Sequence, residues 1–400
     1  MPPRLTPSHT EGRNRVTPRR TILAPTRYPW RFNGPANSRH RIENRDFLPL
    51  NYISATIEGV TAFNPWPPRR FDLVHAFNRI PLGRTPFVIG FESHLPRAFG
   101  VEGGRWWNWM TGALAGARCR GIVAISEFSR RVLLAQHDRA TRSAAARAAI
   151  VGKLHVRYPN LALPAEADLV PVTGSNQIRV VFVGNHFARK GGCVAVVMAE
   201  LARARGIPLV VDIVSRLEMG GTIWTDPSDS EAFKRYRALL DQPNVTLHRD
   251  LANTQVMALL RRADLSLLAT FGDTFGYSAL ESLANGTPVL ATRQGALPEF
   301  IQHGRNGILL DLPVTSEGEW VHLGTKDRAA PGFVRMWHEE VQRLAEQALT
   351  AVAEIAAAPS RLQGMRQDAR RSAERFSAEA ARPWWDDFYD RACNGVVTAE

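Results

Sequence analysis

The 400-residue sequence has few cysteines, few lysines and no long hydrophobic run. Its three cysteines, Cys119, Cys193 and Cys393, are odd in number and far apart, which excludes a disulfide framework and a zinc site. No apolar run reaches the length of about 18 residues that a membrane-spanning helix needs. The chain opens with proline and arginine rather than an apolar signal core. We therefore expect a protein of a reducing compartment and predict a cytoplasmic location.

The overall composition is that of a globular protein. A hydrophobic share of 44% and a charged share of 22% exclude general disorder, a collagen-like repeat and a coiled coil. A chain of 400 residues is longer than one hydrophobic core usually supports. The length therefore predicts two domains.

The net charge of +12 is concentrated at the start of the chain. Residues 1–46 hold ten arginines and three acidic residues, which accounts for +7 of it. We expect residues 1–18 to form a basic, disordered tail. Nucleic-acid binding is ranked last because these arginines lack an aromatic stacking platform. A second possibility is peripheral contact with the anionic inner face of a membrane, through the tail and Trp106, Trp107 and Trp109. The alternative for the three tryptophans is that they pack a helix.

Lysine is scarce among the 50 basic residues. The sequence contains only Lys153, Lys190, Lys234 and Lys326, and the other 46 basic residues are arginine. The lysine ammonium is a compact point charge, whereas the arginine guanidinium is a planar fork. We therefore expect each of the four lysines to lie where the structure requires a compact ammonium rather than a guanidinium.

Strand and helix patterns alternate most clearly in the second half of the chain. The expected strands are 179–184, 209–214, 245–247, 264–269 and 288–291, and the expected helices are about 192–205, 254–262 and 276–285. Helix, glycine and strand recur once more through 298–310. Repeated strand, helix, strand units predict a parallel sheet with helices on both faces.

The first half shows a similar but less regular pattern. Its expected strands are 21–24, 72–75, 87–90 and 121–125, and Ser126 is expected to cap a helix over 127–136. Residues 158–176 read as a linker, and about 331–392 as helices. We place one Rossmann-like domain at 19–172, a second at 173–355, and a helical segment at 356–400 that packs back on the first. Two such domains predict a ligand cleft between the carboxyl edges of their sheets.

The segment Gly184-Asn-His-Phe-Ala-Arg-Lys-Gly-Gly192 follows a predicted strand and opens a predicted helix. It is neither a Walker loop nor Gly-x-Gly-x-x-Gly. Its backbone amides, the positive end of the helix, and the charges of Arg189 and Lys190 together suit a phosphate or diphosphate. The alternative is a glycine turn with solvated charges.

Two carboxylates follow another predicted strand in Asp273-Thr-Phe-Gly-Tyr-Ser-Ala-Leu-Glu281. Asp273 lies in the loop and Glu281 inside the next helix, so both can face the cleft. Carboxylate oxygens accept hydrogen bonds from a sugar or ribose. The alternative is a helix-start charge and a surface glutamate. A third segment, 291–307, places glycine, proline and Glu299 at a helix start, which is also ordinary helix-starting chemistry.

In this order, the three segments resemble family 4 glycosyltransferases, with a clear match over about 178–312. The resemblance implies the α/β GT-B fold, in which two Rossmann-like doubly wound domains face a cleft and helices end the chain. It implies a hexosyltransferase-like enzyme that transfers a sugar from a nucleotide-sugar donor with retention of configuration. No metal and no cofactor besides the donor are implied. The acceptor is a glycan, a lipid-linked or a small molecule, as in polysaccharide biosynthesis.

The resemblance also assigns residues, with domain 19–172 on the acceptor side and domain 173–355 binding the donor. Lys190 would bind the diphosphate, Asp273 the donor sugar and Glu281 the ribose. The family's arginine falls on Asn185, so either Arg189 substitutes for it or one charge is missing. Asp273 is one methylene shorter than the family's glutamate. The implied donor-binding set is Gly184, Asn185, Arg189, Lys190, Asp273, Phe275, Gly276 and Glu281.

In the first domain the resemblance is weaker. His94, just after a predicted strand, corresponds to a histidine that faces the reacting sugar, which makes His94, Lys190 and Asp273 the catalytic candidates; a purely structural role for His94 is the alternative. Asn33-Gly34-Pro35 is the one candidate for the family's glycine loop, and Ser126-Glu127 is expected to line the cleft. These departures leave a second hypothesis, a non-catalytic GT-B protein that binds a sugar nucleotide or a glycan.

Overall fold

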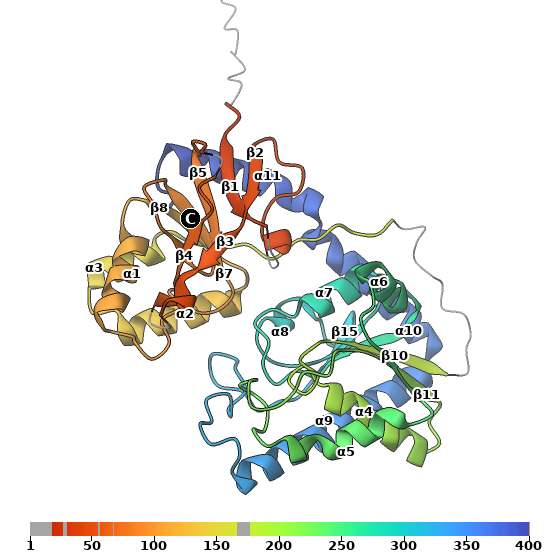
Figure 1. Ribbon diagram of the computed structural model, residues 1–400. Helices are drawn as coiled ribbons and strands as arrows, with labels where there is room; N and C mark the ends of the chain where they lie inside the picture. The colour runs from red at the N-terminus through yellow and green to blue at the C-terminus, as the bar shows by residue number, and fades with distance from the viewer. Residues whose placement is uncertain (1–17, 27–29, 55–56, 67, 166–176, 400) are drawn as a thin grey trace, which may run out of the picture.

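The computed structural model describes residues 18–26, 30–54, 57–66, 68–165 and 177–399, which form two α/β domains (Figure 1). Each domain is built on a six-stranded sheet in which neighbouring strands run parallel. Residues 1–17 of the predicted tail and residues 166–176 of the predicted linker lie outside the described residues.

The N-terminal domain contains the first sheet and three helices. In spatial order its strands are β2 (Arg41–Arg45), β1 (Thr21–Pro25), β5 (Leu73–Phe77), β7 (Phe87–Phe91), β8 (Cys119–Ala124) and β9 (Leu154–Val156). The helices are α1 (Arg105–Ala115), α2 (Glu127–Ala140) and α3 (Ala144–Val151). Ser126 caps α2 as predicted, because its side chain accepts a hydrogen bond from the Ser129 amide.

The C-terminal domain follows the predicted alternation closely. In spatial order its strands are β12 (Val245–His248), β11 (Leu209–Val214), β10 (Ile178–Val183), β13 (Leu265–Leu268), β14 (Val289–Thr292) and β15 (Gly307–Leu310). Its helices are α4 (Gly192–Ala204), α5 (Lys234–Ala238), α6 (Asn253–Arg262), α7 (Tyr277–Ala284), α8 (Leu297–Phe300) and α9 (Pro331–Ala356).

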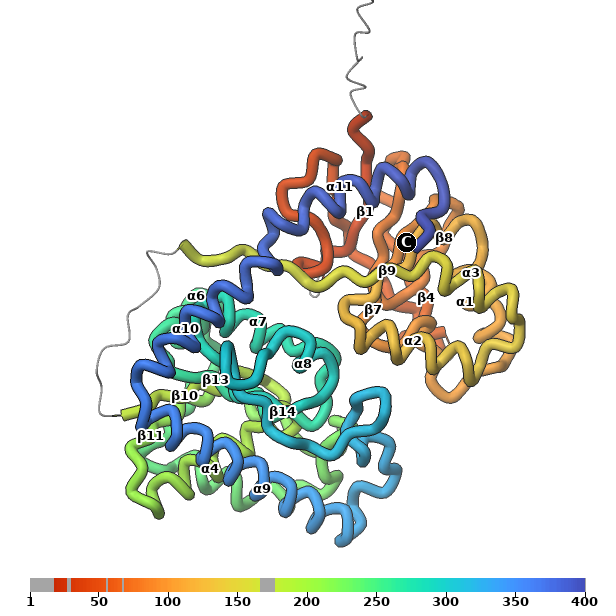
Figure 2. The backbone as a smooth tube through the Cα atoms, turned by 180° about the vertical axis from the view of Figure 1, so that it is seen from behind, coloured from red at the N-terminus to blue at the C-terminus, as the bar shows by residue number. Residues whose placement is uncertain are grey.

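The last two helices divide between the domains. Helix α10 (Pro359–Ala373) packs on α7 and α9 of the C-terminal domain, whereas α11 (Ala378–Asn394) packs on β5 and β8 of the N-terminal domain (Figure 2). The expectation that all of 356–400 returns to the first domain is therefore wrong for α10. The reason is that Leu362 and Met365 of α10 join the core of the C-terminal domain.

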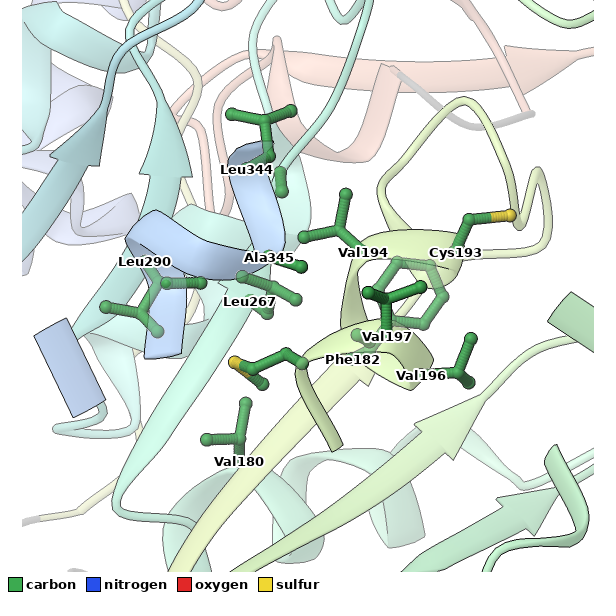
Figure 3. Close-up of a cluster of buried hydrophobic side chains, with 14 of the residues drawn as sticks. Val180, Phe182, Cys193, Val194, Val196, Val197, Leu267, Leu290, Leu344 and Ala345 are labelled. Carbon is green, nitrogen blue, oxygen red and sulfur yellow. The ribbon is translucent and has the colours of Figure 1, made fainter. Parts of the chain in front are cut away.

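That core lies between the sheet and the pair α4 and α9 (Figure 3). Val180 and Phe182 of β10 contact it from the sheet side, and Leu344 from α9. Burying side chains of this size stabilises a fold by roughly 1.5–3 kcal/mol each. Cys193 belongs to the same core and is fully buried, so this thiol acts as a small hydrophobic side chain.

Smaller elements complete the described part of the chain. A three-stranded sheet joins β3 (Phe47–Pro49), β4 (Val60–Phe63) and β6 (Ile80–Pro81). Short 3-10 helices cover η1 (Trp30–Phe32), η2 (Leu50–Tyr52), η5 (Ser230–Phe233), η6 (Leu239–Asp241) and η7 (Glu374–Phe376). Within the described residues, no helix combines the length and the hydrophobicity needed to cross a lipid bilayer.

Candidate active site

A cavity of about 1140 Å³ opens between the two domains. Its walls come from the loops that follow the strands of both sheets, which is where a doubly wound fold binds its ligands. Ionisable side chains from both domains face it, among them Glu92, His94 and Arg97 from the first, and Arg189, Lys190, Asp273 and Glu281 from the second. The cavity therefore brings together most of the residues that the sequence singled out.

The turn that leads from β10 to α4 carries the basic pair. Gly191 adopts a left-handed φ of 95°, and a Cβ atom there would lie 2.5 Å from the carbonyl oxygen of Ala269. Only glycine fits such a position without strain. The glycine thus lets the turn pack tightly against the end of β13 and directs Lys190 into the cavity.

Three amides of this turn are paired within the turn itself, contrary to the prediction that they face a ligand. The amides of Lys190, Gly191 and Gly192 donate to the carbonyl oxygens of His186, Ala188 and Phe187 within the turn. A backbone amide that is already paired has little to offer an anion. The expectation of a phosphate cradle is therefore wrong for these three amides, and Arg189 and Lys190 bring positive charge to this edge through their side chains.

Lys190 and Asp273 form an ion pair inside the cavity. The Lys190 Nζ atom lies 3.0 Å from Oδ2 of Asp273, and their side chains are 20% and 12% exposed. Burial by itself raises the pKa of Asp273, but the charges of Lys190 and Arg189 outweigh it and hold the pKa below its usual value. Asp273 is therefore ionised at neutral pH.

Arg189 is held in place from three sides. Its Nε donates to His186 Nδ1 at 3.0 Å, and its Nη1 donates to the Gly272 carbonyl oxygen. The guanidinium also lies 4.9 Å from the ring centroid of Trp224, which is a cation–π contact. Burial and the nearby Arg189 charge lower the pKa of His186. The ring therefore stays neutral, and its Nδ1 can accept the hydrogen bond from Arg189.

Asn185 lines the cavity without bringing a charge to it. Its carbonyl oxygen accepts the Glu218 amide at 2.9 Å, which ties the turn to the loop after β11. Arg189 lines the same cavity only four residues further on. The site therefore keeps two cations, Arg189 and Lys190, although the family's arginine position is occupied by Asn185.

Glu281 projects from α7 toward the same cavity. Burial raises the pKa of its carboxyl group to about 7, and the charge of Lys190 opposes this rise only in part. The start of α7 contributes Tyr277 and Ser278 to the cavity wall, so the positive end of this helix also faces the site.

Phe275 and Gly276 do not line the cavity, contrary to their predicted place in the donor-binding set. The Phe275 ring is fully buried and stacks on Phe300 at 5.0 Å. Gly276 has a left-handed φ of 90°, and a Cβ atom there would lie 2.6 Å from Leu297. These residues shape the loop from behind: the Phe275 amide donates to the Asp273 carboxylate, which helps to lower its pKa.

His94 lines the N-terminal side of the cavity, as predicted. Its ring meets Phe99 edge to face at 5.3 Å, and its Nδ1 lies 3.3 Å from Ser93 Oγ. Burial, together with the charges of Arg97 and Arg139, lowers its pKa, so the ring is neutral. Sequence reasoning missed Glu92, two residues earlier, although its place directly after a buried strand was a sufficient signal.

The loop around Glu299 joins the two domains. The Glu299 carboxylate accepts the backbone amides of Glu127 and Phe128 at 2.9 and 2.6 Å, and the Tyr158 hydroxyl at 3.0 Å. The amides belong to the first turn of α2, so a carboxylate of one domain caps a helix of the other. This contact holds the Ser126-Glu127 segment beside the C-terminal domain, but contrary to the prediction neither residue lines the cavity.

The predicted glycine loop also forms an interdomain contact. Asn33 Nδ2 donates to the Tyr277 hydroxyl at 2.9 Å, and a Cβ atom on Gly34 would lie 2.5 Å from the Trp30 ring. Neither Asn33 nor Gly34 is among the residues that line the cavity. In this structure the loop packs the domains together rather than presenting itself to a ligand.

Comparison with known proteins agrees with the motifs. Residues 177–318 match the family model described as glycosyl transferases group 1. A D-inositol 3-phosphate glycosyltransferase of Pseudarthrobacter chlorophenolicus is 36% identical over 135 residues, which cover 33% of this chain and 30% of that protein. One from Segniliparus rotundus is 31% identical over 237 residues, or 59% and 44%. The chain thus spans less than half the length of these curated relatives.

Solved structures show the same architecture at low identity. A glycosyltransferase from Rickettsia africae superposes with a TM-score of 0.53 at 16% identity, over 80% of this chain and 77% of the other. HepE of Anabaena in complex with UDP also gives 0.53, at 15% identity over 88% and 86%.

The protein therefore has the GT-B fold that the sequence predicted. The resemblance to family 4 glycosyltransferases is confirmed, because residues 177–318 match the group 1 glycosyltransferase model and the curated relatives are named as glycosyltransferases.

Proposed function

We propose that this protein is a retaining glycosyltransferase, which moves a sugar from a nucleotide donor to a glycan, a lipid-linked molecule or a small molecule. Transfer is proposed to need no metal, because Lys190 and Arg189 supply positive charge at the place where the diphosphate would sit. The two curated relatives described above, both named D-inositol 3-phosphate glycosyltransferase, support this class of reaction.

One observation carries the proposal, namely the ammonium of Lys190 inside the interdomain cavity, 3.0 Å from Asp273. Departure of a nucleoside diphosphate leaves negative charge on the phosphate and cationic character on the sugar. Lys190 and Arg189 would stabilise the first, and the ionised Asp273 the second. Stabilising charge where it develops is usually the largest single contribution to catalysis.

The two ends of the cavity suit the two ends of a donor. Beyond the basic pair, the wall continues along the ends of β10, β11 and β12 with Val214, Arg216 and Leu251, which offers apolar surface and polar groups to a nucleobase. Glu281, which lines the same cavity, would accept hydrogen bonds from the ribose hydroxyls. HepE, solved with UDP, supports a uridine nucleotide as the first candidate.

The alternative hypothesis, a GT-B protein that binds without turnover, is not favoured. Its motivation was the shorter carboxylate at Asp273 and the missing glycine loop. Asp273 still reaches Lys190 across 3.0 Å inside the cavity, so the shorter side chain is compatible with catalysis. The segment Asn33-Gly34-Pro35 does not line the cavity, but the names of the relatives favour a protein that catalyses transfer.

We also propose that the protein reaches a lipid-linked acceptor through peripheral contact with an anionic membrane. Trp106 and Trp109 of α1 are 47% and 45% exposed, whereas Trp107 is buried in the core, so two of the three tryptophans are available. Co-sedimentation with anionic vesicles tests this part. Trp106→Ala should reduce binding at low salt, and equal binding by the variant would remove the membrane from the proposal.

A thermal-shift panel of UDP-, GDP-, ADP- and TDP-sugars tests the main proposal. A donor that binds only the folded state raises its melting temperature. We expect one nucleotide class to give a shift, and slow release of that nucleotide in the presence of a hydroxyl acceptor. The anomeric configuration of the product, measured by NMR, then tests retention. No shift with any donor would reject the proposal.

A further inference from the structure

The N-terminal domain presents one carboxylate to the cavity, and it comes from Glu92. Glu92 directly follows β7, which lies between β5 and β8 near the middle of the first sheet. The carboxyl ends of such strands are the usual position for groups that act on a ligand. Its position is therefore that of a functional residue, opposite the donor-binding edge of the other domain.

Glu92 is held rigidly by its neighbours. Asn78, directly after the adjacent strand β5, donates from Nδ2 to Glu92 Oε2 at 3.3 Å and accepts the Glu92 amide at 3.0 Å. The Ser129 hydroxyl donates to the Glu92 carbonyl oxygen. Asn78 has a left-handed φ of 60°, which directs its side chain back toward Glu92. Both the backbone and one carboxylate oxygen of Glu92 are thus fixed.

The second carboxylate oxygen is free to act. Among the residues that the structure describes, none donates a hydrogen bond to Glu92 Oε1. A carboxylate with one oxygen anchored and the other unoccupied in a cavity can accept a hydroxyl proton from a ligand. The anchored oxygen keeps the free one in a single orientation.

The polar neighbours of Glu92 come from both domains: Asn78 and Arg97 from its own, and Asp273 and Arg189 from the other. Burial raises the pKa of its carboxyl group, the charge of Asp273 adds to the rise, and Arg97 and Arg189 oppose it. His94, in contrast, responds to Arg97, Arg139 and Glu102 of its own domain. The charges of the donor-binding edge therefore act on Glu92, whereas the charges that act on His94 come from its own domain.

We propose that Glu92 is the proton acceptor for the attacking hydroxyl of the acceptor, which makes it a catalytic residue of the N-terminal domain. The inference rests on the proposed glycosyltransferase function. The acceptor hydroxyl approaches the anomeric carbon on the face from which the diphosphate departs, as a single displacement with retained configuration requires. Its O–H bond breaks, the proton moves to Glu92 Oε1, and an oxygen electron pair forms the bond to the anomeric carbon. The bond from that carbon to the diphosphate oxygen breaks, and its electron pair leaves with the diphosphate beside Lys190.

An anionic acceptor separates this role from donor binding, because azide attacks without losing a proton. The experiment measures nucleotide release from the donor chosen by the panel, with water, glycerol or sodium azide as acceptor. We expect Glu92→Gln to slow release with water and glycerol by about a hundredfold, the scale of general base catalysis. Release with azide should stay close to the wild-type azide rate.

Two further variants keep the test sharp. Glu102→Gln removes an exposed carboxylate of the same domain outside the cavity and should behave as wild type. Asn78→Gly suits the left-handed backbone and removes only the anchor, so hydroxyl transfer should slow less than in Glu92→Gln, with azide release unchanged. If Glu92→Gln does not fold, the Asn78→Gly result decides.

Each contrary result has its own meaning. Equal loss of hydroxyl and azide reactions would place Glu92 in donor binding and overturn the inference. Unchanged hydroxyl transfer in Glu92→Gln would also overturn it, while the proposed function stands. If the wild-type protein binds no nucleotide sugar, the proposed function fails, and the role of Glu92 falls with it.

Discussion

Two parts of the molecule, one in each domain, place a lysine ammonium beside oxygen atoms that accept its protons in hydrogen bonds or an ion pair. At the end of α1, Lys153 donates to the carbonyl oxygens of Leu114, Ala115 and Gly116 at 2.9, 2.8 and 2.8 Å. At the turn before α4, Lys190 lies 3.0 Å from the Asp273 carboxylate. The sequence marks both lysines equally, as rare ammonium groups in an arginine-rich chain.

The difference between the two lies in what each ammonium can still do. Lys153 is 5% exposed, and its three donors are occupied by the last turn of a helix, whose negative end it neutralises. Burial lowers its pKa. Lys190 has one charged partner and faces an open cavity. A lysine sealed against carbonyls supports the fold, whereas one that shares a cavity with a single carboxylate can meet a ligand.

The largest expected effect concerns Lys190. Lys190→Ala should reduce sugar transfer by roughly a hundredfold or more, the scale of losing one preorganised donor to developing charge. Its melting temperature should stay near that of the wild type. The control is Lys234→Ala, since Lys234 is exposed beside Glu231 outside the cavity. Near-normal turnover of Lys190→Ala would contradict a catalytic role for Lys190, and with it the functional difference from Lys153.

Lys153 should show the opposite behaviour. Lys153→Met leaves three helix-end carbonyls without their donor, and hydrogen bonds to a charged group contribute roughly 1.5–3 kcal/mol. We expect a loss of that order in the free energy of unfolding, measured by urea denaturation. The transfer rate per folded molecule should not change. A stable but inactive variant would contradict the structural role.

Glu299 is the negatively charged counterpart of Lys153. Its carboxylate accepts backbone amides from the other domain, whereas Lys153 donates to backbone carbonyls of its own domain. Glu299→Gln weakens the cap on α2, a type of contact that contributes about 0.5–2 kcal/mol. We expect a several-fold rise in the donor KM with little change in kcat, because the paired domains form the site. The check is steady-state kinetics together with small-angle scattering. An unchanged KM and an unchanged radius of gyration would show that the contact does not hold the domains.

The smallest expected effect is a gain in stability at Glu281. Its folded pKa of about 7 lies above the ordinary glutamate value, so the folded state binds the proton more tightly. The associated stability is full below the ordinary value and is lost as the pH rises through 7. Glu281→Gln should therefore raise the melting temperature by a few degrees at pH 8 and not at pH 4.

The same substitution should weaken donor binding. A rise in melting temperature that persists at pH 4 would mean that the carboxylate charge is not the cause. Such a result would also argue against the view that the ionised cavity residues lower the stability of the fold, whereas Lys153 raises it.

The C-terminal domain was predictable because most of its strands, from β10 to β15 apart from the edge strand β12, are largely buried. Strand β11, for example, has the predicted bounds Leu209–Val214, since an apolar run between turn residues has one interpretation. The N-terminal domain was harder. Strand β2 (Arg41–Arg45) lies at a sheet edge and carries charges, so it shows no apolar signal. Helix α1 was not expected because Gly104, which offers no capping side chain, precedes it.

The site was predictable where a side chain carries the chemistry. Lys190, Asp273 and Glu281 meet in the cavity as the spacing and the family resemblance implied. The amides of the glycine turn could not be assigned from sequence, because a tight turn can satisfy its own hydrogen bonds. Phe275 illustrates the converse: a residue inside a ligand-binding motif can serve the core.

The most direct test of the account is whether Lys190 binds the diphosphate itself. Calorimetry should compare the nucleoside diphosphate chosen by the panel with its nucleoside, in the wild type and in Lys190→Ala. The account predicts that the diphosphate adds much affinity in the wild type and far less in Lys190→Ala, with nucleoside affinity unchanged. An equal gain from the diphosphate in both proteins would contradict it.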